Sequence, residues 1–194
     1  MKHPLFAALA APLLLLPPLV ALAEPVAPDA AGALLYHPEH VEVVRYNAEG
    51  LSDQEVQILA SVAQGQKYYA AVAFAPADGL MSEATVMAAN HHSVEAARTA
   101  ALAECEGRRA NPGRCVTVME VRPAGWAARD LQLSAAATAA VGANVPEREG
   151  VMAISPATGL WGMAAGANAP AEALAACAEA EDAPAGDCVV AIAE

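Results

Sequence analysis

Positive charge is scarce in this chain. Its 194 residues contain ten lysines and arginines against 22 aspartates and glutamates, and the formal net charge is −12. A surface of this sign repels nucleic-acid phosphates and anionic membrane surfaces. We therefore expect no nucleic acid among its partners, and the negative charge itself identifies no other partner.

Long apolar stretches are missing after the first 23 residues. Those 23 have a basic start at Lys2, an apolar run over residues 6–20 and a small-x-small site at residues 21–23, the pattern of a cleavable secretory signal. The run is shorter than the roughly 20 residues of a membrane-spanning helix, and prolines interrupt it. We expect an exported protein, periplasmic or secreted, that begins near Glu24 and has no membrane span.

Known catalytic motifs are also missing. The chain has no G-x-S-x-G, P-loop, dinucleotide-binding or H-E-x-x-H sequence, each of which sets a reactive group or a phosphate in a defined local geometry. Gly159, Gly162 and Gly166 do not have the spacing of a phosphate-binding loop, so we interpret them as strand and turn glycines. No cofactor is expected.

An internal repeat is the most informative pattern that is present. Residues 71–80 match residues 151–160 at a constant offset of 80. Five positions are identical, and in the first copy they are Ala73, Pro76, Ala77, Gly79 and Leu80. An alanine-rich segment that ends in cysteine follows in both copies. The chain therefore reads as a tandem duplication.

Each copy has the pattern helix–strand–strand–helix–strand. In the first copy, Ser52 and Glu55 form a capping box that starts a helix. A Pro-x-x-Gly turn then joins strands at about residues 69–75 and 80–88. Ser93 caps the second helix, and the closing strand begins at the second cysteine. The predicted divisions are a signal peptide at 1–23, an N-terminal lead at 24–50, copy one at 51–121, a linker at 122–132 and copy two at 133–194.

The predicted fold class is α+β, with largely antiparallel sheet and two copies that share a core, because a unit of this size buries little surface alone. Residues 24–35 are expected to be flexible, and residues 41–44 are expected to add an edge strand. Copy two has about eight fewer residues before its first cysteine, so its second helix should be shorter.

The four cysteines are Cys105, Cys115, Cys177 and Cys188. An even number in an exported chain indicates disulfides, with three pairings possible, and the spacing is too wide for a C-x-x-C zinc site. The duplication favours Cys105–Cys115 and Cys177–Cys188, because a unit that once stood alone would have closed its own bridge.

The repeat resembles a domain-of-unknown-function family of small exported bacterial proteins. The matching residues are the Ser-Pro-x-x-Gly turn at 155–159 with Cys177 and Cys188, and Ala75 replaces the serine in copy one. The resemblance implies a fold and no catalytic residue. Similar proteins are sometimes labelled 5-aminolevulinic acid synthase. That enzyme needs pyridoxal phosphate, a Schiff-base lysine and a large cofactor domain, so we consider the label unsupported.

Polar positions present in one copy only are the candidates for an added function. At the constant offset, Glu83 aligns with Met163 and Ser82 with Gly162. The candidate cluster is Ser82, Glu83, Thr85, Asn90, His91 and His92. Residues 37–40 and 90–92 also contain histidines, but adjacent histidines on a strand point to opposite faces. Ordinary surface residues are favoured there, and no metal site is expected.

Two classes of function remain. We expect a non-catalytic exported binding or structural module, with a protein or a small molecule as its ligand. The alternative is a small periplasmic hydrolase or metal-dependent enzyme that uses the polar cluster of copy one. A pocket that holds both Glu83 and His91 would favour the enzyme, and scattering of these residues over the surface would favour the module.

The rejected synthase label can be tested directly, because Lys67 is the one lysine left after the signal peptide. Added pyridoxal phosphate should give no absorbance band that disappears in Lys67→Ala. A stoichiometric adduct at Lys67 that borohydride traps would overturn this rejection.

Overall fold

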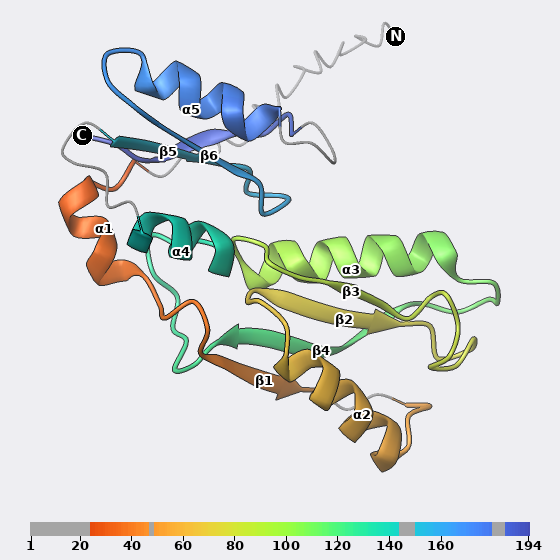
Figure 1. Ribbon diagram of the computed structural model, residues 1–194. Coiled ribbons are helices and arrows are strands. Elements are labelled where there is room, and N and C mark those ends of the chain that lie inside the picture. Colours follow the sequence, from red (N-terminus) through yellow and green to blue (C-terminus); the bar gives the residue numbers. More distant parts are fainter. Residues whose placement is uncertain (1–23, 47–48, 144–149, 180–184) are drawn as a thin grey trace, which may run out of the picture.

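The computed structural model describes residues 24–46, 49–143, 150–179 and 185–194, and the predicted signal peptide lies outside them (Figure 1). The described chain has the predicted α+β class, with two antiparallel sheets. Its helices are α1 (Pro28–Leu34), α2 (Asp53–Gln64), α3 (Val94–Arg108), α4 (Ala135–Ala143) and α5 (Ala169–Ala178). Its strands are β1 (Val41–Arg45), β2 (Ala70–Phe74), β3 (Val86–Ala88), β4 (Val116–Pro123), β5 (Gly150–Ile154), β6 (Trp161–Ala165) and β7 (Val189–Ile192).

The first sheet has the strand order β1-β4-β2-β3, with α2 and α3 on opposite faces (Figure 1). Residues of β2 alternate between these faces, as the sequence predicts. Val72 and Phe74 pack with Leu59 of α2, whereas Ala71 and Ala73 pack with Ala97 of α3. The predicted capping box of Ser52 and Glu55 starts α2.

The second sheet has the order β6-β5-β7 and repeats this arrangement. Met152 and Ile154 pack with Val141 of α4, whereas Ala153 packs with Ala173 of α5. A Cβ atom at Gly162 would overlap the backbone of α5. The glycine in β6 therefore allows α5 to lie directly on the sheet.

The two halves share further details of construction. The order β4-β2-β3 corresponds to β7-β5-β6, and the register shifts between Val72 and Ala73 in β2 and between Met152 and Ala153 in β5. A disulfide joins the last turn of α3 or α5 to the strand that follows it. The pairs are Cys105–Cys115 and Cys177–Cys188, as predicted, and no cysteine is free.

The predicted strand at residues 80–88 is too long. Residues 80–85 form turns, and only Val86–Ala88 pair with β2. Met87 lies opposite Val72, as Met163 lies opposite Met152. Met87 is seven positions after Leu80 and Met163 is three after Leu160, so the first half has four extra residues in this turn. The alignments of Glu83 with Met163 and of Ser82 with Gly162 are therefore wrong.

The second half is therefore shorter than the first in two places. Part of the difference lies in the turn before the strand, and part lies in the helix. α3 has 15 residues and α5 has 10, so the second helix is shorter, as predicted.

Residues 24–35, which were expected to be flexible, have a defined structure. Val26 pairs in parallel with Ile192, because its N–H donates to Ala191 O at 2.9 Å and its carbonyl accepts from Ala193 N–H at 3.1 Å. Ala31 of α1 is buried in the apolar cluster of Met152. This segment thus covers the open edge of β7, while β1 covers the edge of β4 as an added strand, as predicted.

Arg129 of the linker holds the end of α1. Its guanidinium donates to the carbonyl oxygens of Leu34 and Leu35 and lies over the ring of Tyr36, 3.7 Å from its centroid. A cation at a helix C-terminus satisfies carbonyls that lack a partner within the helix. The linker and the lead are therefore fastened to each other.

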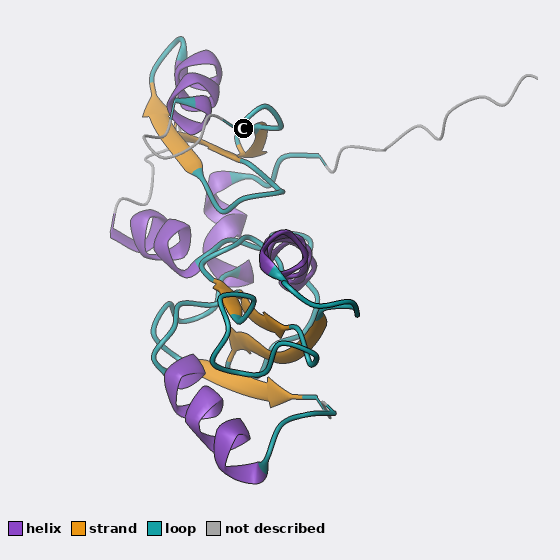
Figure 2. Ribbon diagram, turned by 90° about the vertical axis from the view of Figure 1, so that its right-hand side faces the viewer, coloured by secondary structure: helices purple, strands orange, loops and turns teal. Residues whose placement is uncertain are grey.

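The core is divided between the sheets. α1 and α4 lie at the level between the two sheets in both views (Figures 1 and 2). Buried apolar residues form four clusters, each on one face of one sheet. Ala135 is the member of the second half that joins a cluster of the first sheet. In the described chain, the buried core that the two halves share is therefore smaller than predicted.

Residues 133–194 expressed alone should fail to fold as a monomer, because they lose the Val26 pairing, the cover of Ala31 and the contacts of His92. Circular dichroism and gel filtration should show an unfolded or self-associated fragment. Calorimetry on the whole chain should show one cooperative transition. Two transitions, together with a monomeric fragment that unfolds sharply, would mean that the halves are independent.

Candidate functional site

The two halves meet where the β3–α3 connection of the first touches the Pro-x-x-Gly turn of the second. Asn90 in this connection has a φ of 62°, and its side-chain oxygen accepts the N–H of Ala136 at 3.0 Å. A Cβ atom at Gly159 would overlap the carbonyl oxygen of Asn90. Glycine at this position therefore lets the two backbones touch.

His92 is the central side chain of this junction and is only 3% exposed. Its Nε2 lies 2.9 Å from Leu160 O, and its Nδ1 accepts the N–H of Ser134 at 3.0 Å. Because Nδ1 is an acceptor, the imidazole proton is assigned to Nε2, which donates to the Leu160 carbonyl. His92 thus joins α3, the start of α4 and the second sheet with one neutral ring.

Burial lowers the pKa of His92 to about 4, although the Leu160 carbonyl acts in the opposite direction. The neighbouring His91 also lowers this pKa, and Asp187 raises it. The ring is therefore neutral at physiological pH. With both nitrogens engaged, it can neither accept nor deliver a proton without breaking the junction.

The turn that faces His92 is held by hydrogen bonds to one aspartate, an arrangement that we call an aspartate clamp. Asp187, next to Cys188, accepts the hydroxyl of Ser155 at 2.5 Å and the N–H of Ala157 at 2.8 Å. Thr158 donates its hydroxyl to Ser155 Oγ at 2.8 Å. Partial burial alone would raise the pKa of Asp187, but these hydrogen bonds outweigh it and lower the pKa. The disulfide loop thereby fixes the turn.

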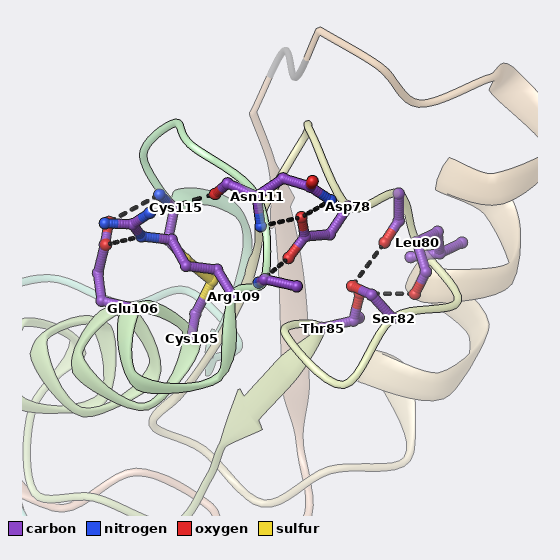
Figure 3. The surroundings of a disulfide bond; sticks show 11 residues. Asp78, Leu80, Ser82, Thr85, Cys105, Glu106, Arg109, Asn111 and Cys115 are labelled. Atoms are coloured by element: carbon purple, nitrogen blue, oxygen red, sulfur yellow. Dashed lines mark hydrogen bonds and ion pairs between the residues drawn. A yellow bond between two sulfur atoms is a disulfide. The ribbon is translucent and has the colours of Figure 1, made fainter.

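The first half has a corresponding aspartate clamp. Here the carboxylate lies in the turn and its hydrogen-bond donors lie in the disulfide loop. Asp78 lies in the turn itself and accepts the N–H groups of Ala110 and Asn111 in the disulfide loop, at 2.7 and 2.9 Å (Figure 3). Glu106 accepts the N–H of Cys115 at 2.8 Å and holds the other end of this loop (Figure 3). Hydrogen bonds from these backbone groups lower the pKa of both carboxyl groups.

A cavity of about 510 Å³ lies beside the junction. Its walls come from the lead, from the start of α3, from the linker and from the second sheet. Most of the lining is apolar, and this part comprises Val26, Leu131, Ile154, Pro156, Val189 and Val190 among others. A volume of roughly 300–1,000 Å³ with such walls is typical of small-molecule sites.

The polar part of the lining contains Glu24, His92, Ser93, Asp130 and Gln132. Ser93 Oγ accepts the N–H of Ala96 and caps α3. Gln132 accepts the indole N–H of Trp126 at 3.2 Å. These two side chains and His92 are held in place by contacts within the protein.

The predicted polar cluster is not brought together. Ser82, Glu83 and Thr85 precede β3, whereas Asn90, His91 and His92 follow it. The hydroxyl groups of Ser82 and Thr85 donate to the carbonyls of Gly79 and Leu80, and Glu83 is exposed. His91 Nδ1 contacts the carbonyl of Thr158 at the junction. Of the six candidates, His92 alone lines the cavity.

The histidines at residues 37 and 40 lie apart from the junction. His37 and His40 stack on each other with ring centroids 3.8 Å apart, and both are exposed. Within the described residues, no group of three or more histidine, cysteine or acidic side chains is placed to hold a metal ion.

A buried ion-pair network in the first sheet was not predicted from the sequence. Glu120 is fully buried on β4, where it pairs with Arg98 of α3 and with Arg122. Burial alone would raise the pKa of Glu120, but the two arginines outweigh it and lower the pKa. Its cross-strand neighbour on β2 is Ala71, whose small side chain leaves room for this network. Each charge is paired, as burial demands.

No family model, no curated protein and no solved structure matches this chain. The resemblance to a family of small exported proteins therefore remains a prediction. In the described parts of the chain, no helix is long and apolar enough to cross a membrane.

Acidification from pH 7 to pH 5 should destabilise the protein through His92. The folded-state pKa of about 4 lies below the ordinary 6.5, so this contribution is complete above about pH 6.5 and is lost as the pH falls toward 4. The full shift corresponds to about 3 kcal/mol. Urea unfolding at each pH measures the effect, since the paired carboxylates act mainly below about pH 5.

His92→Gln serves as the control, because glutamine does not titrate, and its unfolding free energy should vary less over this range. NMR titration of the His92 ring in the wild type provides an independent readout. A ring pKa near 6.5 in the folded protein would contradict the assigned role.

Proposed function

We propose that this chain is a non-catalytic exported module, made of a duplicated unit, that binds a small ligand in the cavity between its halves. The observation that carries the proposal is the cavity of about 510 Å³ with mainly apolar walls. Apolar walls with a few fixed polar groups suit reversible binding of a small molecule.

The duplication is supported by features that sequence identity alone does not require. Both halves have the same strand order, a register shift at the corresponding position and a disulfide between corresponding elements. The cavity then lies where one unit meets the next and draws its walls from both halves, the lead and the linker. This is a common place for a ligand in a protein made of two units.

The hydrogen bonds of the polar groups in the cavity lining support a non-catalytic function. A nucleophilic mechanism needs a hydroxyl or thiol within hydrogen-bond reach of an available base. His92 has both nitrogens engaged, and the hydroxyl of Ser93 caps α3. Glu83 and His91 lie at opposite ends of β3 and outside the cavity lining, so the hydrolase alternative lacks the pocket that would favour it.

Filling the cavity should greatly weaken binding of an apolar probe. Val189→Trp places an indole in the lining, and Val62→Trp places the same indole on the exposed side of α2, where Val62 is 50% exposed. Titration with Nile red should show saturable binding to the wild type and to Val62→Trp, and greatly weakened binding to Val189→Trp.

Thermal unfolding of both variants shows whether each is folded before the titrations are compared. Equal binding of Nile red to folded Val189→Trp and to the wild type would place the probe elsewhere and would refute the cavity as the site. Mass spectrometry of an organic extract of the purified protein would identify a ligand that it retains.

A further inference from the structure

The charged groups of the cavity lining have one sign. Glu24 and Asp130 contribute carboxylates, and no lysine or arginine is among the described lining residues. His92 is neutral for the reasons given above. The lining therefore presents an excess of negative charge beside an apolar surface.

The neighbouring cation does not cancel this charge. Arg129 precedes Asp130 in the chain, but its guanidinium is engaged by the carbonyls of Leu34 and Leu35 and by the ring of Tyr36. Over the described chain, neither Glu24 nor Asp130 takes part in an ion pair or a side-chain hydrogen bond. Both carboxylates are free to meet a ligand.

Removal of the predicted signal peptide changes the sum without changing its sign. Cleavage after Ala23 would place one α-ammonium group on Glu24. The two carboxylates and this one cation would then leave a single net negative charge in the lining. The new cation would belong to Glu24 itself, so Asp130 would be the lining carboxylate without a cation on its own residue. Asp130 is therefore the residue on which charge recognition depends.

We infer that the cavity takes a cationic amphiphile, a molecule with an apolar body and a protonated amine or similar cationic group. The apolar body lies against residues such as Leu131 and Ile154, and the cation meets Asp130. The N-terminus of α3 at Ser93 disfavours positive charge, which assigns the cation to Asp130 rather than to the helix end. This inference rests on the proposed function and names the ligand class for the same site.

Three probes of matched length test the inference. Octylamine, octanol and octanoate share an apolar chain and differ in the charge of one end. Calorimetric titration at pH 7 should rank their affinities octylamine, then octanol, then octanoate. Higher salt should weaken octylamine binding and leave octanol binding nearly unchanged, because salt screens partly exposed charges.

Asp130→Asn removes the charge and keeps the size of the side chain. It should weaken octylamine by up to about five-fold, the effect of a partly exposed ion pair, and leave octanol unchanged. Glu49→Gln removes one exposed negative charge outside the cavity lining and should bind all three probes like the wild type. An equal loss in Glu49→Gln would attribute the effect to overall charge and overturn the assignment to Asp130.

The outcomes separate this inference from the proposed function. Binding of octanol or octanoate at least as tight as that of octylamine, with Nile red still excluded by Val189→Trp, would overturn the cationic class and leave the cavity as a binding site. Failure of all three probes, together with equal Nile red binding by wild type and Val189→Trp, would overturn both.

Discussion

The junction between the halves depends on one neutral imidazole. His92 receives a hydrogen bond from Ser134 at the start of α4 and gives one to Leu160 at the start of β6, so the first half holds two separate segments of the second. A buried ring whose two nitrogens are both satisfied contributes direction as well as stability, because each bond requires its own partner at a fixed angle. This contact fixes Ser134 and Leu160 relative to the start of α3, beside the cavity that His92 lines.

Small side chains make the rest of the arrangement possible. Alanines on β2 and β5 let α3 and α5 approach their sheets, and the alanine opposite Glu120 leaves space for its two arginines. Such faces bury little apolar area per residue, which explains why each unit also has a disulfide and an aspartate clamp. The clamps use Asp78 in one half and Asp187 in the other, and they connect the same two loops from opposite sides.

Local signals predicted much of the fold, and tertiary contacts account for the rest. The capping box at Ser52, the alternating faces of β2 and the two disulfides were all readable, because each depends on residues close in the chain or on the repeat. The short β3 was not, since four extra residues broke a constant offset. The cavity also could not be predicted from the sequence. Its walls come from the lead, the start of α3, the linker and the second sheet, and the composition of the lead indicated a flexible segment.

The contact between the halves uses a different surface of each half. The turn at residues 155–160 of the second half docks on residues 90–92 of the first, while the corresponding turn of the first half, next to the 95% exposed Met81, carries no such partner among the described residues. A two-fold arrangement would have used both surfaces twice and produced paired sites. A head-to-tail arrangement forms its interface once. The cavity beside this interface therefore has no symmetric counterpart generated by the same contact, and under the proposed function one molecule takes one ligand.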